Sequence, residues 1–251
     1  MKNNWTKDVL NNFENASSKY NQHADLQRTC AWKLAQECSV QSIAKGLWVD
    51  LGSGTGLLAD AIEENNPERT VLRVDGSKKM LKKNKEGSKT YLWDLNKGIP
   101  NWEQKPTLLG SSFVLHWLKD PYTRLEEWLS TLSSQGVLAL AVPINESFPE
   151  WKIAAAAAEE PFTGLSLPSH DLILNCLKKG DIKYEKVESF TYTRNDVLSL
   201  LKPIINVGAH TKTQNSLSIS GWKKIMNSWP QISEDQLVSL TWQVQLVIVQ
   251  L

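Results

Sequence analysis

The sequence predicts an α/β fold in which helices cover both faces of a mostly parallel sheet. Short apolar runs alternate with segments that can be helical from residue 47 to residue 142, which is the pattern of such a sheet. Glycines at positions 52, 54 and 56 follow the first run, and an acidic residue stands at the end of each of the first three runs. The 251 residues are 41% hydrophobic, enough for one full core, so we expect one domain over 1–251.

The expected elements fall into three regions. Residues 1–45 form a helical segment whose apolar side chains recur at helical spacing. Residues 46–142 form the core, with strands at 47–51, 70–74, 90–93, 107–113 and 136–142 and helices at 57–65, 77–85 and 120–132. Residues 143–251 add a strand at 184–192, a last strand within 237–251, and helices near 151–160, 169–179, 194–202 and 219–228. We expect the two late strands to complete a seven-stranded sheet and the inserted helices to form a lid.

The glycine turn indicates the kind of ligand. Asp50 precedes Gly52, Gly54 and Gly56, where a backbone with positive φ and no Cβ lets a ligand come close. A dinucleotide turn needs a glycine at the sixth position, where this chain has leucine or alanine, and a phosphate loop needs a lysine after the glycines. Phosphate ligands are therefore excluded. A tight turn without any ligand is the alternative for this motif alone.

Two later acids extend the same site. Asp75 ends the second strand, and an ionised carboxylate only accepts hydrogen bonds, which suits the two hydroxyls of a ribose. Gly76 follows, and the soft side chain of Met80 could line an adenine. Asp94 ends the third strand and precedes Leu95. Each acid alone could be a solvated strand end, but three of them at one edge of a sheet favour a shared nucleotide-like ligand.

This Asp-x-Gly-x-Gly-x-Gly turn resembles the first motif of the Rossmann-like S-adenosylmethionine methyltransferases. The resemblance implies that S-adenosylmethionine is the cofactor, that Asp94 holds its adenine amino group and that Leu95 lies beside the ring. It further implies that the segment after the fourth strand passes the sulfonium. Ser111 is assigned to the cofactor site there, and Ser112 stands where many of these enzymes have asparagine.

The stretch from Tyr20 to Arg28, YNQHADLQR, is more specific. With the motifs above, Leu115-His116-Trp117, Pro149-Glu150, Leu201-Lys202 and Gly208-Ala209, it resembles the malonyl-acyl-carrier-protein O-methyltransferases of biotin synthesis over nearly the whole chain. Ser53 and the segment 204–207 depart from the family pattern. The implied acceptor is the free carboxylate of a malonyl thioester, on acyl carrier protein or coenzyme A. It is ionised at neutral pH, so no general base is expected.

The candidate acceptor-binding residues can hold a carboxylate or shape its pocket: Tyr20, His23, Arg28, His116, Trp117, Lys202, His210 and Lys212. Core packing is the alternative for Trp117, and a surface role for His116. Methylation of another small acid, or a non-catalytic module that binds S-adenosylmethionine, also fits the core motifs.

Composition and charge limit the kinds of binding partner and the cellular compartment to be expected. The net charge of +1 predicts no general attraction to nucleic acid, and no apolar stretch predicts a membrane span or a secretion signal. Three cysteines without metal spacing and four scattered histidines predict reduced thiols, no metal and a cytoplasmic protein, which we expect to be a monomer. Two lysine groups are either solvated or a landing surface for an acidic carrier: Lys78, Lys79, Lys82, Lys83 and Lys85, and Lys178, Lys179, Lys183 and Lys186.

Overall fold

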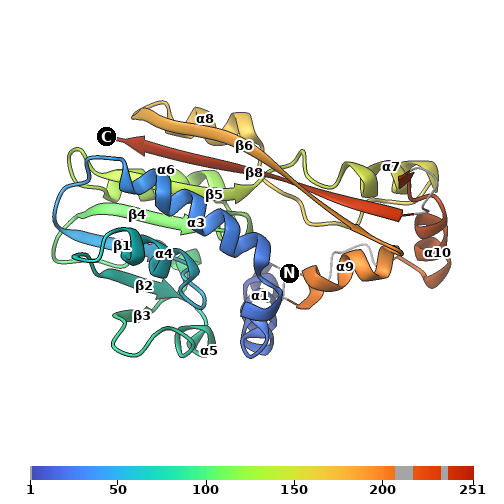
Figure 1. Ribbon diagram of the computed structural model, residues 1–251, viewed down its shortest axis with the longest axis horizontal. Helices are drawn as coiled ribbons and strands as arrows, with labels where there is room; N and C mark the ends of the chain where they lie inside the picture. Colours follow the sequence, from blue (N-terminus) through green and yellow to red (C-terminus); the bar gives the residue numbers. More distant parts are fainter. Residues whose placement is uncertain (1, 207–216, 233–236) are drawn as a thin grey trace.

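The computed structural model describes residues 2–206, 217–232 and 237–251, and it contains the predicted sheet (Figure 1). Seven strands lie in the order β3-β2-β1-β4-β5-β8-β6, and the short β7 pairs with β8. Their bounds are β1 Leu47–Leu51, β2 Val71–Asp75, β3 Thr90–Leu92, β4 Pro106–Ser112, β5 Val137–Pro143, β6 Asp181–Arg194, β7 Gln231–Ile232 and β8 Leu237–Gln250. The α/β prediction is confirmed, and β7 is an addition that the sequence pattern did not indicate.

The first five strands are parallel, while β8 runs antiparallel between β5 and β6. The last residue of β5, Pro143, pairs with Val244 of β8. Residues 238–243 of β8 therefore continue past β5, paired with residues 189–194 of β6. This two-stranded extension, with the three helices at its end, is here called the arm (Figure 1). Those helices are α7 Pro149–Ala157, α9 Val197–Asn206 and α10 Ile219–Asn227.

Helices cover both faces of the sheet, as predicted. On one face α3 (Asp25–Ser39) and α4 (Leu57–Asn65) bury apolar side chains against the strands. On the other face α6 (Pro121–Thr131) and α8 (His170–Leu177) do the same. The sequence interpretation counted the helix near 169–179 among the lid helices, which is wrong. Ile173 and Leu177 of α8 are fully buried in the core beneath α6, because the polar side chains of this helix lie on its opposite side.

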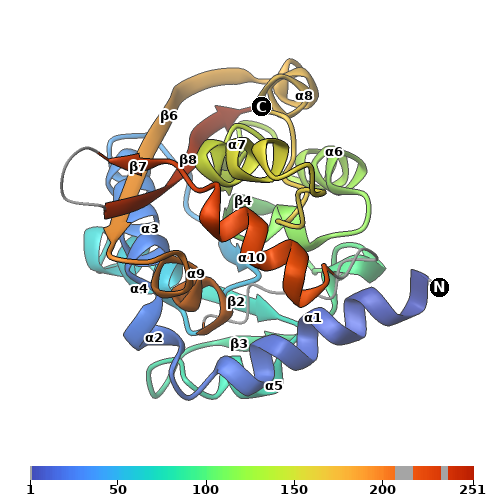
Figure 2. The ribbon, with the colours of Figure 1, turned by 90° about the vertical axis from the view of Figure 1, so that its right-hand side faces the viewer.

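The N-terminal helices lie at the carboxyl edge of the strands. These are α1 (Lys2–Ala16) and α2 (Tyr20–His23), and α1 crosses below the arm helices when the arm faces the viewer (Figure 2). The helix expected at 77–85 ends early, since α5 spans only Lys78–Leu81. Beyond it, the side-chain amide of Asn84 donates to the Leu81 carbonyl at 3.0 Å, and this local bond competes with further helical turns. Two short 3₁₀ turns, η1 (Leu95–Lys97) and η2 (Leu115–Trp117), follow β3 and β4.

Within the described residues no helix is long and apolar enough to cross a membrane. Cys30 and Cys38 are buried free thiols on α3, and burial raises the pKa of each to about 12. The expectation of one domain over 1–251, divided near residues 45 and 142, stays a prediction.

Candidate active site

The glycine turn after β1 has the left-handed backbone that its sequence predicts. The φ angles of Gly52, Gly54 and Gly56 are +70°, +54° and +91°. A Cβ on Gly52 would lie 2.3 Å from a methyl of Val114, whereas a Cβ on Gly54 would meet nothing within 4 Å. Gly52 is therefore required by packing. Gly54 leaves open space in front of the turn, into which a ligand can come close.

Asp75, at the end of β2, holds this turn. Its Oδ2 accepts the Gly54 amide at 2.8 Å, and its Oδ1 accepts the Ser77 amide at 2.7 Å. Burial raises the pKa of Asp75, and these two amide bonds oppose that rise. Because two carboxylate oxygens can accept about four hydrogen bonds, capacity remains for a diol.

Asp50 lies on the other side of the turn, at 1% exposure. Its Oδ2 accepts the Ala59 amide of α4 at 3.2 Å. Burial is the largest cause that raises the pKa of Asp50 to about 7, against the Ala59 bond and the positive charge of Arg73. In a cleft that excludes water, a cation beside this carboxylate would therefore lower its pKa again.

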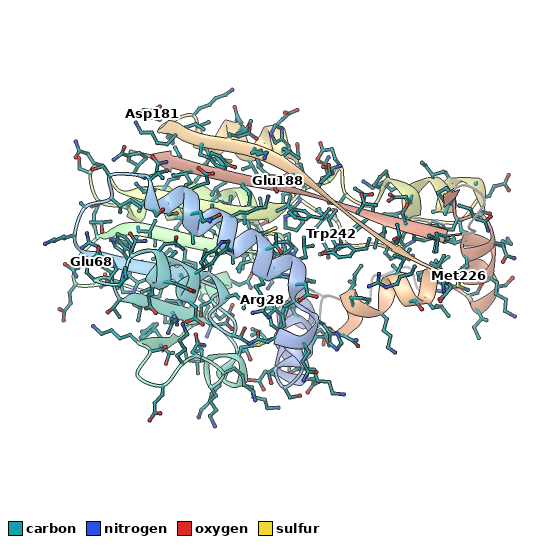
Figure 3. The ribbon with its side chains drawn as sticks, in the orientation of Figure 1. Arg28, Glu68, Asp181, Glu188, Met226 and Trp242 are labelled. Carbon is teal, nitrogen blue, oxygen red and sulfur yellow. The ribbon has the colours of Figure 1, made fainter. Side chains whose placement is uncertain are left out.

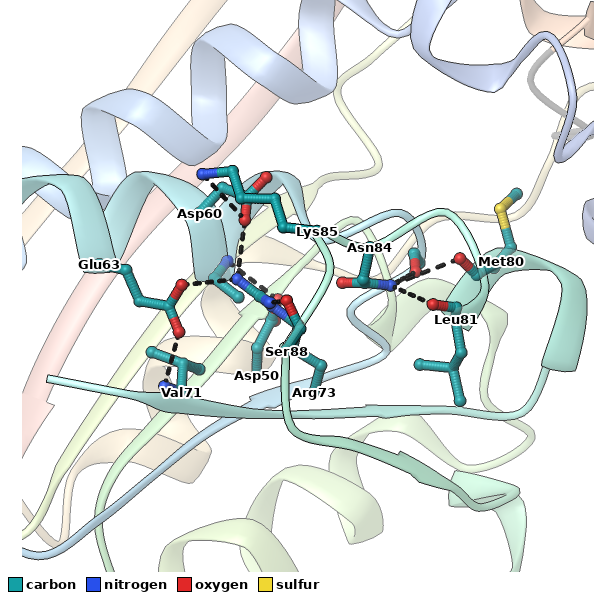
Figure 4. Close-up of polar contacts among 12 residues, drawn as sticks. Asp50, Asp60, Glu63, Val71, Arg73, Met80, Leu81, Asn84, Lys85 and Ser88 are labelled. Atoms are coloured by element: carbon teal, nitrogen blue, oxygen red, sulfur yellow. Dashed lines mark hydrogen bonds and ion pairs between the residues drawn. The ribbon is translucent and has the colours of Figure 1, made fainter.

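A buried arginine links β2 to α4 behind the turn (Figure 4). The Arg73 side chain is 1% exposed and pairs with Asp60 and Glu63, each at 2.7 Å. It also donates to the hydroxyl of Ser88. On the cleft side, Asn84 donates to the Gly54 carbonyl at 3.0 Å. The turn is thus held by β2 and by the segment after α5 together.

These elements enclose a cleft of about 900 Å³ beyond the carboxyl ends of β1, β2 and β4, here called the donor cleft. Eight of the ten predicted cofactor residues line it: Asp50, Gly52, Gly54, Asp75, Gly76, Met80, Asp94 and Leu95. Its opposite wall comes from α1, which the sequence interpretation did not assign to the site. Leu10 and Phe13 of α1 line the cleft, and the Phe13 ring meets Trp117 edge-on at 5.4 Å.

The N-terminal motif forms another part of this wall. The hydroxyl of Thr55 in the glycine turn donates to the side-chain oxygen of Asn21 at 2.6 Å, which joins α2 to the turn. Tyr20 lines the donor cleft, and burial, helped by the negative charge of Asp75, raises the pKa of its phenol. Tyr20 therefore stays a protonated hydrogen-bond donor at neutral pH.

Two predicted cofactor residues do not line the cleft. Ser111 is fully buried inside the sheet, where its hydroxyl donates to the Leu51 carbonyl at 3.0 Å. The next residue, Ser112, lines the cleft instead, because successive side chains of a strand point to opposite faces. A Cβ on Gly56 would lie 2.3 Å from Asn84, so this glycine serves the packing of the turn.

The predicted acceptor residues do not form one cluster. Tyr20 and Trp117 line the donor cleft, whereas Arg28 is exposed and donates to the Asn21 carbonyl at 2.7 Å. Lys202 is exposed on α9. His116 is buried beside Phe113 and Trp117, and burial lowers its pKa to about 3, so it is neutral and lies outside the cleft lining. His210 and Lys212 lie outside the described residues.

A second pocket of about 750 Å³ adjoins the donor cleft, here called the arm pocket. It lies where α2 and α3 face the arm. His23 lines it, together with Tyr192 and Arg194 of β6 and Trp242 of β8, whose position between sheet and arm is seen in Figure 3. The aromatic and arginine contributions come from strands far along the chain, so the sequence alone did not reveal them.

The donor cleft fits S-adenosylmethionine by its chemistry. Acidic acceptors stand where a ribose and an adenine would lie, and the turn leaves space that a Cβ on Gly54 would fill. The buried hydroxyl oxygens of Ser53 and Ser112, both in cleft-lining residues, have no partner among the described residues. Such orphaned polar atoms are costly unless a ligand satisfies them.

The fold and the cleft fit those of the class I S-adenosylmethionine-dependent methyltransferases. Residues 49–140 match the family model described as a methyltransferase domain. The fold is that of the YcgJ protein of Bacillus subtilis, with a TM-score of 0.58 and 13% identity over 88% of this chain and 97% of that one. It is also that of an S-adenosylmethionine-dependent methyltransferase of Archaeoglobus fulgidus, with a TM-score of 0.51 and 14% identity over 92% and 99% of the two chains.

By sequence, the chain is similar to malonyl-[acyl-carrier protein] O-methyltransferases. That of Laribacter hongkongensis is 24% identical, over 94% of this chain and 86% of the relative. That of Salmonella typhimurium is 24% identical, over 87% and 88% of the two chains. The trans-aconitate 2-methyltransferase of Deinococcus radiodurans is 33% identical, but over only 45% of this chain and 43% of its own. The predicted resemblance and the predicted cofactor are confirmed.

Proposed function

We propose that this chain methylates the free carboxylate of a malonyl thioester on acyl carrier protein, giving the methyl ester that primes pimeloyl synthesis for biotin. One observation supports this most. The segment from Tyr20 to Arg28, which carries the resemblance, lies between the two pockets: Tyr20 lines the donor cleft and His23 lines the arm pocket. The similarity to the malonyl-carrier enzymes also extends over most of the chain, beyond the shared methyltransferase core.

The residues of the donor cleft have separate tasks in this proposal. Asp75 accepts the ribose hydroxyls, Asp94 and Leu95 take the adenine, and Asp50 faces the cationic methionine end. The apolar wall of α1 and Trp117 keeps water away from the reacting atoms. Excluding water strengthens the attraction between an anionic acceptor and a cationic donor, since little solvent screens it.

The chemistry requires alignment more than proton transfer. S-adenosylmethionine held by the donor cleft would supply the methyl group, which an acceptor oxygen would bond as the carbon–sulfur bond breaks and its electron pair stays on sulfur. No proton moves, which agrees with a Tyr20 phenol and a His116 imidazole that burial keeps from acting as a base and an acid, respectively. Holding the two reactants in line can supply roughly 7–11 kcal/mol of the barrier reduction.

One charged group of the arm pocket suits an anionic acceptor. Arg194 lines this pocket together with Asp25, and its guanidinium donates to the Thr193 carbonyl at 2.7 Å with further donors available. Leu200 and Leu240 add apolar surface, as a thioester chain would need. After methylation the group is uncharged, so it can enter apolar acyl pockets that would resist a bare carboxylate.

The carrier protein would meet an exposed basic surface. Lys82 and Lys83 of the first lysine group are exposed beside α5, next to the donor cleft. Lys183 and Lys186 of the second group lie on β6 and pair with Asp181 and Glu188. In the first group Lys79 and Lys85 also pair with carboxylates, but Lys82 and Lys83 lie nearer the site, and binding of an acidic carrier there should weaken as salt rises.

The test is methyl transfer from labelled S-adenosylmethionine to a set of acceptors. We expect label on malonyl-carrier protein or malonyl-coenzyme A and none on acetyl-carrier protein, which lacks the free carboxylate. Labelling of neither malonyl thioester, while the donor binds measurably, would refute the proposal. That result, with no other acceptor labelled, would favour a non-catalytic module that binds S-adenosylmethionine.

Methylation of a free small acid is the second candidate. The similarity to trans-aconitate 2-methyltransferases, such as that of Deinococcus radiodurans, favours it, although this similarity covers less than half of the chain. Including trans-aconitate and free malonate in the same assay separates the two candidates. Faster transfer to a free acid than to either malonyl thioester would support the second.

A further inference from the structure

The donor cleft and the arm pocket share one residue among those that the structure describes. Gln27, in the first turn of α3, lines both. The other lining residues belong to one pocket or the other. The side chain of Gln27 therefore lies at the junction of the two spaces, where a group entering from the arm pocket would first meet the donor.

Gln27 is mostly buried, and its side chain faces the two pockets that it lines. Its exposure is 9%, its side-chain amide makes no hydrogen bond within the described residues, and it is not among the fully buried polar atoms that lack a partner. The amide is therefore open to a ligand in either pocket. Elsewhere on α3, Leu26, Cys30 and Leu34 fill buried positions with apolar or weakly polar side chains. An amide at this one buried position, facing both pockets, indicates a ligand that it binds.

Aromatic rings form the wall beside Gln27. Phe113 lines the donor cleft and Trp242 lines the arm pocket, with 6.3 Å between their ring centroids. Phe148 packs edge-on against Trp242 at 4.5 Å. Both phenylalanines have positive φ, +58° and +64°, which non-glycine residues adopt only when packing holds them there. The wall is thus fixed in shape, and Gln27 supplies a polar group beside it.

The junction lies at the reacting end of the donor. Asp94 and Asp75 follow β3 and β2, so an adenine and a ribose bound by them occupy the far side of the donor cleft. The methionine end then lies toward Asp50 and Phe113, at the ends of β1 and β4. Phe113 is the residue that touches Trp242 of the arm pocket. An acceptor in the arm pocket would therefore approach the sulfonium methyl, and not the nucleoside.

The arm pocket suits a chain that ends in a carboxylate. Leu26, Leu200 and Leu240 give it apolar walls. Arg194 and Asp25 are the charged residues that line it. The charged groups of the described lining are thus one arginine and one aspartate, with His23 as a titratable neighbour.

We propose, on the basis of the proposed function, that the arm pocket holds the acceptor chain and that the Gln27 amide donates a hydrogen bond to the acceptor carboxylate. The bond holds one oxygen and leaves the other directed at the methyl carbon. A neutral donor orients the carboxylate without neutralising it, whereas a lysine or arginine at the same place would reduce its nucleophilicity. Gln27 is then an acceptor-binding residue that separates carboxylates from neutral acyl groups.

The test uses two variants of nearly the same size as the wild-type residue. Gln27→Met removes the donor, and Gln27→Glu replaces it with a negative charge. Gln36→Ala is the matched control, because Gln36 is an exposed glutamine on the same helix. For Gln27→Met we expect kcat/KM for the malonyl thioester to fall about 10- to 100-fold, the effect of one hydrogen bond to a charged group, with the donor Kd changed less than about threefold.

The pH profile separates a direct contact from a structural role. In the Gln27→Glu variant the carboxylate should repel the acceptor, and protonation at low pH should restore a neutral donor. Its kcat/KM relative to wild type should therefore rise as pH falls, while that of Gln27→Met should not. Equal loss in donor binding and acceptor turnover, or a flat ratio for Gln27→Glu, would overturn the inference.

A measurement on the wild-type protein tests the same contact if the variants fail to fold. The side-chain amide of Gln27, identified in ¹⁵N spectra by its absence in Gln27→Met or by selective labelling, should shift when malonyl-coenzyme A is added to the S-adenosylhomocysteine complex. It should not shift with acetyl-coenzyme A. An unchanged resonance at saturating malonyl-coenzyme A would contradict the contact. If the wild-type enzyme methylates no malonyl thioester at all, the proposed function itself fails, which is a distinct result.

Discussion

The carboxylate of Asp75 accepts a hydrogen bond from the amide of Gly54 at 2.8 Å. The acid that ends β2 therefore fixes the turn that follows β1, and both face the donor cleft. Ribose recognition and the shape of the glycine turn thus depend on one side chain. This coupling lets mutations distinguish effects on the turn from effects on the ligand.

Asp75→Ala should weaken S-adenosylmethionine binding by about 100-fold or more. The variant loses two acceptor positions for the ribose, and each hydrogen bond to a charged group contributes about 1.5–3 kcal/mol. Isothermal calorimetry measures the effect. Asp171→Ala is the control, because the Asp171 side chain is 93% exposed. Unchanged affinity in Asp75→Ala would remove Asp75 from the cofactor site.

Gly54→Ala should reduce donor binding while costing only about 1–2 kcal/mol of unfolding free energy, the usual penalty for a left-handed alanine. The added methyl would meet no protein atom but would project into the open space of the turn. Gly87→Ala is a close control, since Gly87 has φ +80°, also with nothing within 4 Å. Urea unfolding should show similar costs for both variants, and calorimetry should show weaker donor binding for Gly54→Ala alone. Equal donor affinities would contradict a ligand at the turn.

Asp50 should make donor binding depend on pH. Burial raises its pKa to about 7 in the free protein, and a cationic ligand beside it should lower that pKa. Binding then releases protons below about pH 7, and affinity rises as pH approaches 7 from below. Calorimetry in two buffers of different ionisation enthalpy measures the release. Asp50→Asn should abolish it, and the same proton release in that variant would assign the effect to another group.

The same shift affects stability in the opposite sense. The folded protein holds the Asp50 proton up to about pH 7, whereas the ordinary pKa of an unfolded aspartate is 3.8. Because the folded state binds more protons between these values, the Asp50 contribution to the unfolding free energy falls as pH rises through that interval. Urea titrations of the ligand-free protein at several pH values should show a smaller fall for Asp50→Asn than for wild type. An identical pH slope would contradict the raised pKa.

Arg73→Met should destabilise the protein by about 3–5 kcal/mol, because it removes the buried partner of two partly buried carboxylates, those of Asp60 and Glu63. Lys85→Met is the control. Lys85 also pairs with Asp60, at 3.3 Å, but its side chain is 63% exposed, so its loss should cost less than about 1 kcal/mol. Urea midpoints compare the two. A loss in Arg73→Met no larger than in Lys85→Met would show that the buried pairs contribute little.

The parts of the site that the sequence predicted are local in the chain. Asp75 ends a strand of one sheet, and Gly52, Gly54 and Asp94 follow neighbouring strands of it, so a pattern of short runs was enough to place them at one edge. Ser112 lines the cleft in place of the predicted Ser111, and the cause of this difference is equally local. In a strand a shift of one residue moves a side chain to the other face, and apolar patterning does not determine where β4 ends to within one residue.

The parts that the sequence missed depend on long-range packing. Leu10 and Phe13 reach the cleft because α1 lies across the strand ends, and periodicity alone gives a helix no direction in space. Arg194 and Trp242 reach the arm pocket because β6 and β8 run past β5, a length difference visible only in the strand pairing. Gln27 belongs to the motif from Tyr20 to Arg28, but its burial between two pockets depends on how α3 packs against the sheet and the arm.

The most direct test of the central proposal is to measure the mass of the acceptor before and after the reaction. Malonyl-carrier protein incubated with the enzyme and S-adenosylmethionine should gain the mass of one methylene group, and mild alkaline hydrolysis of the ester should reverse the gain. Acetyl-carrier protein should keep its mass. An unchanged malonyl-carrier mass, under conditions in which trans-aconitate or another free acid is methylated, would contradict the proposed function.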